Sequence, residues 1–414
     1  MRARTTNRPW ELFKSFLLLC LLILVFAAIA WPVCSQEANR QRPRRVTGVE
    51  KQSPPVDKPV KASGEEVNEG DVVRVETQLV SVPAVVSDAA GRHLATLRAE
   101  NFTVFEDDQK QTIANFSTTE APFEIALLLD TSASTRDDVA LIRRAATAFI
   151  DALRPGDRVA VIAFNTSKGN RTLRATVEVL SKLTSDRKEL RRAIDNLGSS
   201  NGTPFYDALQ RIATEVFREQ PRREVSGRQA IVALTDGVDS TSEADFSQAR
   251  AKLLRSGLAC YFIQVNTEDF VEDRLLKDCQ DDGRLSLSAK QLQRYRRIFV
   301  PRAQSDEYEN FCQMGPFQRM QISRDLYNLA RVEMNDLAKI TGGRNFVAAS
   351  LQDARAAFAQ VATEIGTQYS LGYYPTNKAN DGQFRTIRVE LRGVQGNPKV
   401  RAREGYYAPK EGRQ

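Results

Sequence analysis

The stretch Glu124-Ile-Ala-Leu-Leu-Leu-Asp130-Thr-Ser132-Ala-Ser134 decides the fold of this chain. It begins as an uninterrupted apolar run of strand length, as a strand buried on both faces of a parallel sheet requires. The run breaks at Asp130 into one carboxylate and two alternating hydroxyls, Ser132 and Ser134, at the strand end where α/β folds place ligand sites. Such oxygen-only donors suit a hard divalent cation, Mg²⁺, Mn²⁺ or Ca²⁺. A helix N-cap is the alternative, because Ser and Asp are preferred there.

Apolar strands and amphipathic helices alternate after this stretch. The pattern predicts strands at 158–164, 172–179, 229–235, 258–265 and 345–347. It predicts helices at 137–153, 186–197, 203–217, 244–256, 326–340 and 351–365. This alternation is typical of an α/β fold with a doubly wound, mostly parallel sheet.

Two flanking segments change to the period of two that is typical of antiparallel strands. Residues 72–119 contain four short strand patterns, and 369–375, 384–391 and 400–407 contain three more. The N-terminal segment is too short to close a core comfortably by itself, and the C-terminal strands could complete it. We therefore expect both flanks to form one small β-sandwich-like unit, with the α/β domain inserted between its halves.

These patterns divide the chain into consecutive parts. Residues 267–322 break the strand–helix rhythm with many charges and are interpreted as an insertion in the α/β domain. Residues 36–71 are rich in Pro and charge and too poor in aliphatic residues to fold, so they are interpreted as a linker. The predicted parts are a leader at 1–35, a linker at 36–71, the first β half at 72–120, the α/β domain at 121–367 and the second β half at 368–410.

The leader has the order of an export signal. Arg2, Arg4, Arg8 and Lys14 precede an apolar core at 16–30, which is short for a membrane span. We therefore expect export to the periplasm, the cell envelope or the extracellular space. An uncleaved N-terminal anchor is the alternative, and it would tether the protein to a membrane.

The net charge of +7 does not indicate nucleic-acid binding. Residues 1–62 carry eleven Lys or Arg and four Asp or Glu, so the remaining chain is neutral. The positive charge belongs to the leader and linker rather than to a folded face. No nucleic-acid partner is expected.

Histidine and cysteine are scarce. One histidine, His93, excludes a zinc site built on paired histidines and makes a Ser-His-Asp triad depend on a residue in a turn. Cys279 and Cys312 flank the irregular insertion, and we predict a disulfide between them in an oxidising compartment. Two unpaired thiols remain the alternative, because spacing alone does not prove pairing.

Further oxygen donors follow later segments of the predicted sheet. Thr203 lies in the loop Gly202-Thr203-Pro204, and Asp236 follows the strand at 229–235. Together with Asp130, Ser132 and Ser134, these side chains converge at one sheet edge. Two carboxylates balance a divalent charge, and the hydroxyls supply neutral ligands.

The three motifs together resemble the von Willebrand factor type A family. The flanking segments that begin at Asn101, Tyr369 and Arg403 resemble those of an exported bacterial subgroup of this family. The family pattern Asp-x-Ser-x-Ser, a later Thr and Thr-Asp-Gly corresponds here to Asp130, Ser132, Ser134, Thr203 and Asp236. The resemblance covers about residues 121–367. It implies a metal-ion-dependent adhesion site, most often with Mg²⁺, in which the hydroxyls bind the metal directly and the carboxylates act through water. It also implies that an Asp or Glu of a protein partner takes the open metal position.

The favoured function is therefore a metal-dependent protein-interaction module without chemistry of its own. A metal-dependent phosphohydrolase using Asp130 is one alternative, but that arrangement calls for a second carboxylate where this chain has Ser132. A structural cell-envelope protein with an unoccupied site is the other alternative.

Overall fold

The computed structural model describes residues 79–118, 120–132, 139–168, 173–218, 228–275, 287–302 and 310–410. All of them belong to one compact unit, Arg74–Gln414. The predicted leader, the whole predicted linker, Ser134 and Cys279 lie outside these residues. None of the described helices is both long and apolar enough to cross a membrane.

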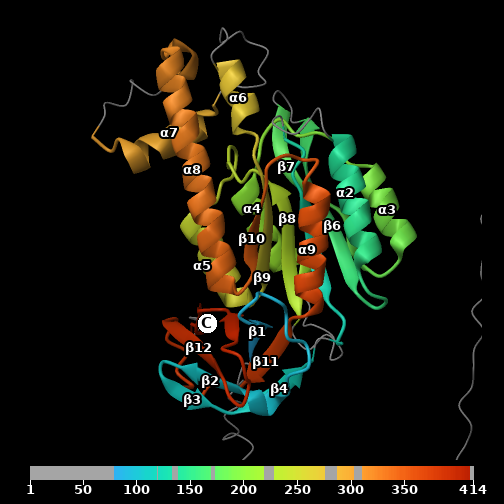
Figure 1. Cartoon of the computed structure of the whole chain (residues 1–414). Helices are drawn as coiled ribbons and strands as arrows, with labels where there is room; N and C mark the ends of the chain where they lie inside the picture. The colour runs from blue at the N-terminus through green and yellow to red at the C-terminus, as the bar shows by residue number, and fades with distance from the viewer. Residues whose placement is uncertain are drawn as a thin grey trace, which may run out of the picture. The chain divides into compact units, whose positions relative to one another are not determined.

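A six-stranded sheet forms the centre of the α/β part, in the order β10-β9-β8-β5-β6-β7 (Figure 1). Neighbouring strands run parallel except β6 and β7, which are antiparallel. The strands are β5 Glu124–Leu129, β6 Arg158–Lys168, β7 Leu173–Thr184, β8 Gln229–Thr235, β9 Ala259–Val265 and β10 Arg344–Ala348. The predicted fold class is confirmed.

Helices cover both faces of this sheet (Figure 1). Strand β5 is buried throughout, because Ile125, Leu127 and Leu129 face one helical layer while Ala126 and Leu128 face the other. The first layer consists of α2 Val139–Ala152, α3 Arg187–Asp195 and α9 Ala354–Gly366. The second consists of α4 Phe205–Arg211, its π-helical continuation η3 Ile212–Val216, α5 Phe246–Ser256 and α8 Pro316–Thr341.

The region predicted as an insertion contains regular helices. They are α6 Glu268–Leu275, α7 Ala289–Phe299 and the short 3-10 helix η5 Phe311–Gln313. Helix α8 begins at Pro316, ten residues before the predicted start at Leu326, and Gly315 is its N-cap. The prediction missed the first turns of α8 because this part of the helix packs against α7, through Ile322 and Leu326, rather than against the sheet.

The flanking segments build two four-stranded antiparallel sheets, β13-β1-β11-β4 and β14-β12-β2-β3. One core with residues from both sheets lies between them, including Val82, Val104, Leu371 and Val389. The N-terminal strands are β1 Val80–Ser87, β2 Phe102–Glu106, β3 Gln109–Gln111 and β4 Ile113–Ser117. A short 3-10 helix, η1 Ala99–Asn101, lies between β1 and β2. The C-terminal strands are β11 Tyr369–Tyr373, β12 Phe384–Leu391, β13 Lys399–Ala402 and β14 Gly405–Tyr407.

The single strand predicted at 400–407 is wrong, because the chain changes sheet at Arg403. The buried Arg403 guanidinium donates to the carbonyl oxygens of Ser81 (3.0 Å) and Leu254 (2.7 Å). The Glu404 amide donates to the Ile340 carbonyl at 3.0 Å. These bonds end β13 and attach the β unit to the C-terminal ends of α5 and α8.

Gly343→Ala is expected to lower the free energy of unfolding by about 1–3 kcal/mol, the usual cost of overpacking. A Cβ at Gly343 would lie 1.9 Å from the Cys260 carbonyl oxygen, so β9 or the start of β10 must move. Urea unfolding measures the change. The control is Gly315→Ala, where a Cβ meets nothing within 4 Å. An equal, small effect in both variants would contradict the close approach of the two strands.

Candidate functional site

Parallel pairing brings the predicted carboxylates to one edge of the central sheet. Leu129 of β5 is aligned with Leu234 of β8, so Asp130 and Asp236 follow their strands at the same edge. The Asp130 amide donates to the Leu234 carbonyl at 3.0 Å, which extends the pairing to the first residue of the site.

Asp130 is held by hydrogen bonds in a buried position. Its Oδ2 accepts from Thr235 Oγ1 at 2.6 Å, and its Oδ1 accepts from the Ser132 amide at 2.9 Å. The second bond closes a tight turn that brings Ser132 back beside the carboxylate. Thr235 was not predicted as a site residue, although it stands in the quoted Thr-Asp-Gly motif.

Asp236 is held by residues that the sequence analysis missed. Its Oδ2 accepts from Thr267 Oγ1 at 2.8 Å, and Thr267 also shares a 2.7 Å hydrogen bond with Tyr327. Its Oδ1 accepts from the Val238 amide at 3.0 Å. No short motif marks Thr267 or Tyr327, because they reach the site only through the fold.

Thr203 reaches the same edge through a paired loop. Its amide donates to Ser240 Oγ at 2.8 Å, and its carbonyl accepts from the Ser240 amide at 3.0 Å. The preceding loop is joined to the Asp130 loop by a 2.8 Å bond from the Ser200 amide to the Thr131 carbonyl. The predicted loops are thus connected at one edge, whereas the position of Ser134 is not described.

Two buried carboxylates make this edge electrostatically unfavourable without a cation. Burial and, after it, the negative charge of Asp236 raise the pKa of Asp130 to about 7. The donors are carboxylates and hydroxyls, which fit a hard divalent cation. Among the described residues, no group of three or more His, Cys, Asp or Glu side chains is placed to hold a metal, so a cation here would rely on hydroxyls.

Asp239 is a further buried carboxylate that the sequence analysis missed. Its Oδ2 accepts from the amides of Phe205 (2.9 Å) and Tyr206 (3.3 Å) and from the Ser242 hydroxyl. Asp239 therefore caps α4 from a different loop, and burial raises its pKa to about 6. This cap fixes helix α4, which starts two residues after Thr203.

Asp239→Ala is expected to lower the free energy of unfolding by about 1–2 kcal/mol, as loss of a helix cap does. Chemical denaturation measures the loss, and hydrogen exchange should accelerate at the Phe205 and Tyr206 amides. Asp186→Ala removes the corresponding cap of α3, away from the site, and is the matched control. Unchanged exchange at Phe205 in the Asp239 variant would rule out the cap.

The 267–322 region also contains the predicted disulfide. Cys312 is disulfide-bonded, whereas the buried Cys260 is a free thiol. Cys279 lies outside the described residues, so its pairing with Cys312 stays a prediction.

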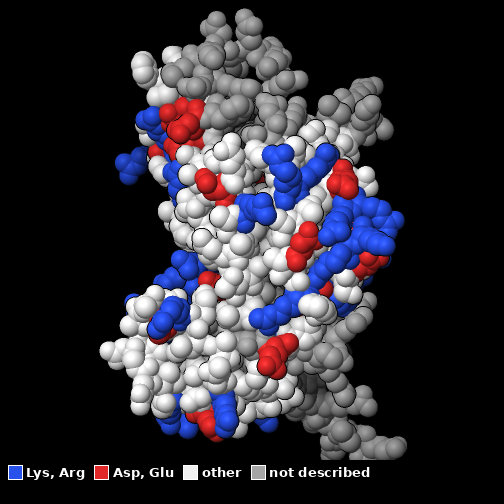
Figure 2. Space-filling model, turned by 45° about the vertical axis from the view of Figure 1, so that its right-hand side comes forward, with Lys and Arg blue, Asp and Glu red and all other residues white. Residues whose placement is uncertain are grey.

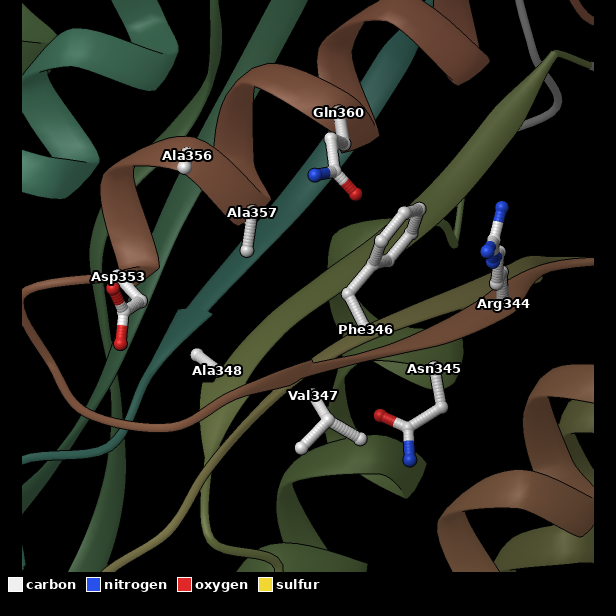
Figure 3. A pocket seen from close by; sticks show the side chains of 9 residues that line it. All are labelled: Arg344, Asn345, Phe346, Val347, Ala348, Asp353, Ala356, Ala357 and Gln360. Atoms are coloured by element: carbon white, nitrogen blue, oxygen red, sulfur yellow. The ribbon is translucent and has the colours of Figure 1, made fainter.

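A separate pocket of about 300 Å³ lies between β10 and α9 (Figure 3). Figure 3 shows Phe346 and Gln360 facing each other across it, with Asp353 at one end and Arg344 at the other. None of the predicted site residues lines this pocket. It therefore gives no support to the candidate site.

Positive charge gathers on one face despite the neutral sum of the folded part. Figure 2 shows Lys and Arg concentrated on the right of the view, over the side of the molecule that carries α2 and α3. Arg191 pairs with Asp151 at 2.7 Å, and Arg143 donates to the Leu197 carbonyl. The exposed basic residues of these helices are Arg144, Lys188, Arg191 and Arg192. This face attracts anionic groups.

Comparison with known proteins identifies similar folds. The model of the von Willebrand factor type A domain family matches residues 124–290. A von Willebrand factor type A protein from Catenulispora acidiphila is 12% identical over 81% of this chain and 75% of its own, with a TM-score of 0.38. Proximal thread matrix protein 1 from the mussel byssus is 12% identical over 58% of this chain, with a TM-score of 0.36.

The SpRpn10 VWA domain is 13% identical over 56% of this chain and 93% of its own, with a TM-score of 0.32. This chain covers 47% of the mussel protein, less than half of that protein's length. No curated protein matches the chain.

Proposed function

Because residues 124–290 form a von Willebrand factor type A domain, we propose that the chain is an exported, metal-dependent protein-interaction module. A divalent cation, Mg²⁺ before Mn²⁺ or Ca²⁺, would be held by Ser132, Ser134 and Thr203, with Asp130 and Asp236 acting through water. An Asp or Glu side chain of the partner would then complete the coordination.

One observation carries this proposal: Asp130 and Asp236 are both buried at an edge whose other donors are hydroxyls. A cation held there supplies the charge that two buried carboxylates need. Water-mediated carboxylates and neutral hydroxyls leave such an ion strongly electrophilic, and an arriving carboxylate neutralises it. Binding by this route requires no catalytic group.

The basic face on α2 and α3 supports an acidic partner. Helix α2 follows the Asp130 loop in sequence, and its exposed Arg144 is one of the residues of this basic face. An acidic protein would be attracted by this charge before it reaches the metal, which raises its association rate. Salt should therefore slow association more than it speeds dissociation.

The test is a pull-down from a cell-envelope extract with the purified protein as bait. Three baits are compared: wild type, Thr203→Ala and Thr166→Ala. Thr166 is a threonine of strand β6 whose hydroxyl donates to Asn201, so it controls for the loss of a threonine hydroxyl near Thr203. Each bait is used with 1–10 mM Mg²⁺ and with chelator, and a melting curve is recorded for each.

Capture is expected from wild type and Thr166→Ala with Mg²⁺ only, and it should be lost from Thr203→Ala without loss of folding. Capture that survives both chelation and Thr203→Ala would mean that the partner docks elsewhere. No metal-dependent capture would favour a structural envelope protein. Phosphate release from an aryl phosphate that depends on Asp130 would favour the phosphohydrolase.

A further inference from the structure

Helix α7 belongs to the region predicted as an insertion, yet it is connected to Thr203 through one loop. This loop, residues 240–243, contacts Thr203 on one side and the start of α7 on the other. On one side, Ser240 exchanges two hydrogen bonds with Thr203, at 2.8 and 3.0 Å. A Cβ at Gly202 would lie 2.6 Å from Thr241 Cγ2, so Thr241 packs directly against the residue before Thr203.

On its other side, loop 240–243 is held by the first turn of α7. Ser288 Oγ donates to the Ser240 carbonyl at 2.5 Å. Lys290 Nζ has three N–H donors, and three acceptors surround it: the carbonyls of Thr241 (3.3 Å) and Ser242 (3.2 Å) and Glu243 Oε1 (2.6 Å). The N-cap residue Ser288 and Lys290 of α7 thus bind four consecutive residues of one loop.

Helix α7 is itself anchored to the α/β core. Arg294 donates to both carboxylate oxygens of Glu333 on α8, at 2.7 and 2.6 Å, and stacks over the Tyr206 ring of α4 at 5.0 Å. Tyr206 donates to the same carboxylate at 2.6 Å. This network is mostly buried. Because a buried polar network whose members are hydrogen-bonded is rigid, it makes α7 a rigid support for the loop.

We propose that α7 is a positioning element for Thr203: Ser288 and Lys290 clamp loop 240–243, and this loop sets the position of the Thr203 backbone. Release of the clamp would let Thr203 move away from the Asp130 edge without unfolding the sheet. Only the expected loss of metal affinity rests on the proposed function. The positioning of Thr203 is testable without metal.

The test compares the double variant Ser288→Ala/Lys290→Met with wild type in the full chain. Hydrogen exchange is followed at the Thr203 and Ser240 amides, which both donate within the paired loop. Calorimetry with Mn²⁺ as the probe measures metal affinity. Exchange at both amides is expected to accelerate about tenfold, and Mn²⁺ affinity to fall about threefold to tenfold, as loss of one or two net hydrogen bonds predicts. Exchange in β5 and β8 should stay unchanged.

Two controls separate positioning from loss of stability. Gln291→Ala breaks the other half of the α7 capping box but keeps both clamp contacts. Lys339→Met removes a lysine that pairs with Glu404 at 3.2 Å, at the end of α8 that contacts the β unit. Neither control should change exchange at Thr203. The variant Lys290→Arg keeps the charge and the donors. It should retain at least half of the exchange protection at Thr203 that the double variant loses.

The outcomes distinguish this inference from the proposed function. Accelerated exchange at Thr203 with no Mn²⁺ binding in any variant would support the positioning role and contradict the metal site. Unchanged exchange in the double variant would overturn the positioning role, even if wild type binds Mn²⁺. Equal acceleration in the double variant and in Gln291→Ala would also overturn it, because the effect would then come from fraying of α7.

Discussion

Mg²⁺ at a hundredfold excess over its dissociation constant is expected to raise the free energy of unfolding by about 2.7 kcal/mol, because a ligand that binds only the folded state stabilises it by mass action. Asp130→Ala should abolish this gain. The metal-free variant should keep its fold, since burial and the charge of Asp236 already disfavour the ionised Asp130 carboxylate. Thermal and urea unfolding with Mg²⁺ and with chelator measure both effects.

Asp157→Ala is the matched control for a buried aspartate. Asp157 accepts hydrogen bonds from the amides of Phe123 and Arg154, at the opposite end of β5 from Asp130. Its loss should destabilise the protein with and without metal, and the gain from Mg²⁺ should remain. If millimolar Mg²⁺, Mn²⁺ and Ca²⁺ all leave the wild-type melting temperature unchanged, the candidate site does not bind a metal.

Deleting residues 369–414 is expected to open the N-terminal strands to protease. Strand β1 lies between β11 and β13, and β2 pairs with β12, so the deletion removes both neighbours of β1 and one neighbour of β2. Cleavage within 80–117 should become at least about tenfold faster, because protection follows the free energy of local opening. Limited proteolysis with mass spectrometry locates the cuts.

Deletion of residues 411–414 alone is the control, since it keeps all four C-terminal strands. This shorter deletion should leave the N-terminal segment as resistant as in the full chain. If the larger deletion also leaves it resistant, residues 80–117 form a stable unit without the C-terminal strands, and the joint β core is not required for their folding.

Several features of the site were predictable because their signals are local. The apolar run 124–129 requires burial on both faces, and its polar break falls at a strand end whatever the rest of the fold is. The motifs at Asp130 and Asp236 follow parallel strands, so they meet at one edge once the sheet is parallel. The pairing of the N- and C-terminal flanks was likewise predictable, because neither flank buries its apolar face alone.

The sequence by itself therefore determined the fold class and the oxygen-rich edge, because strand periodicity and strand ends depend on residues that are consecutive in the chain. Only the tertiary structure decided which residues hold that edge: Thr267 and Tyr327 beside Asp236, Asp239 as the cap of α4, and Ser288 on the Ser240 loop. It also decided that the chain changes sheet at Arg403. Each of these contacts joins residues far apart in the chain, and a hydrogen bond between distant residues leaves no periodic pattern in the sequence.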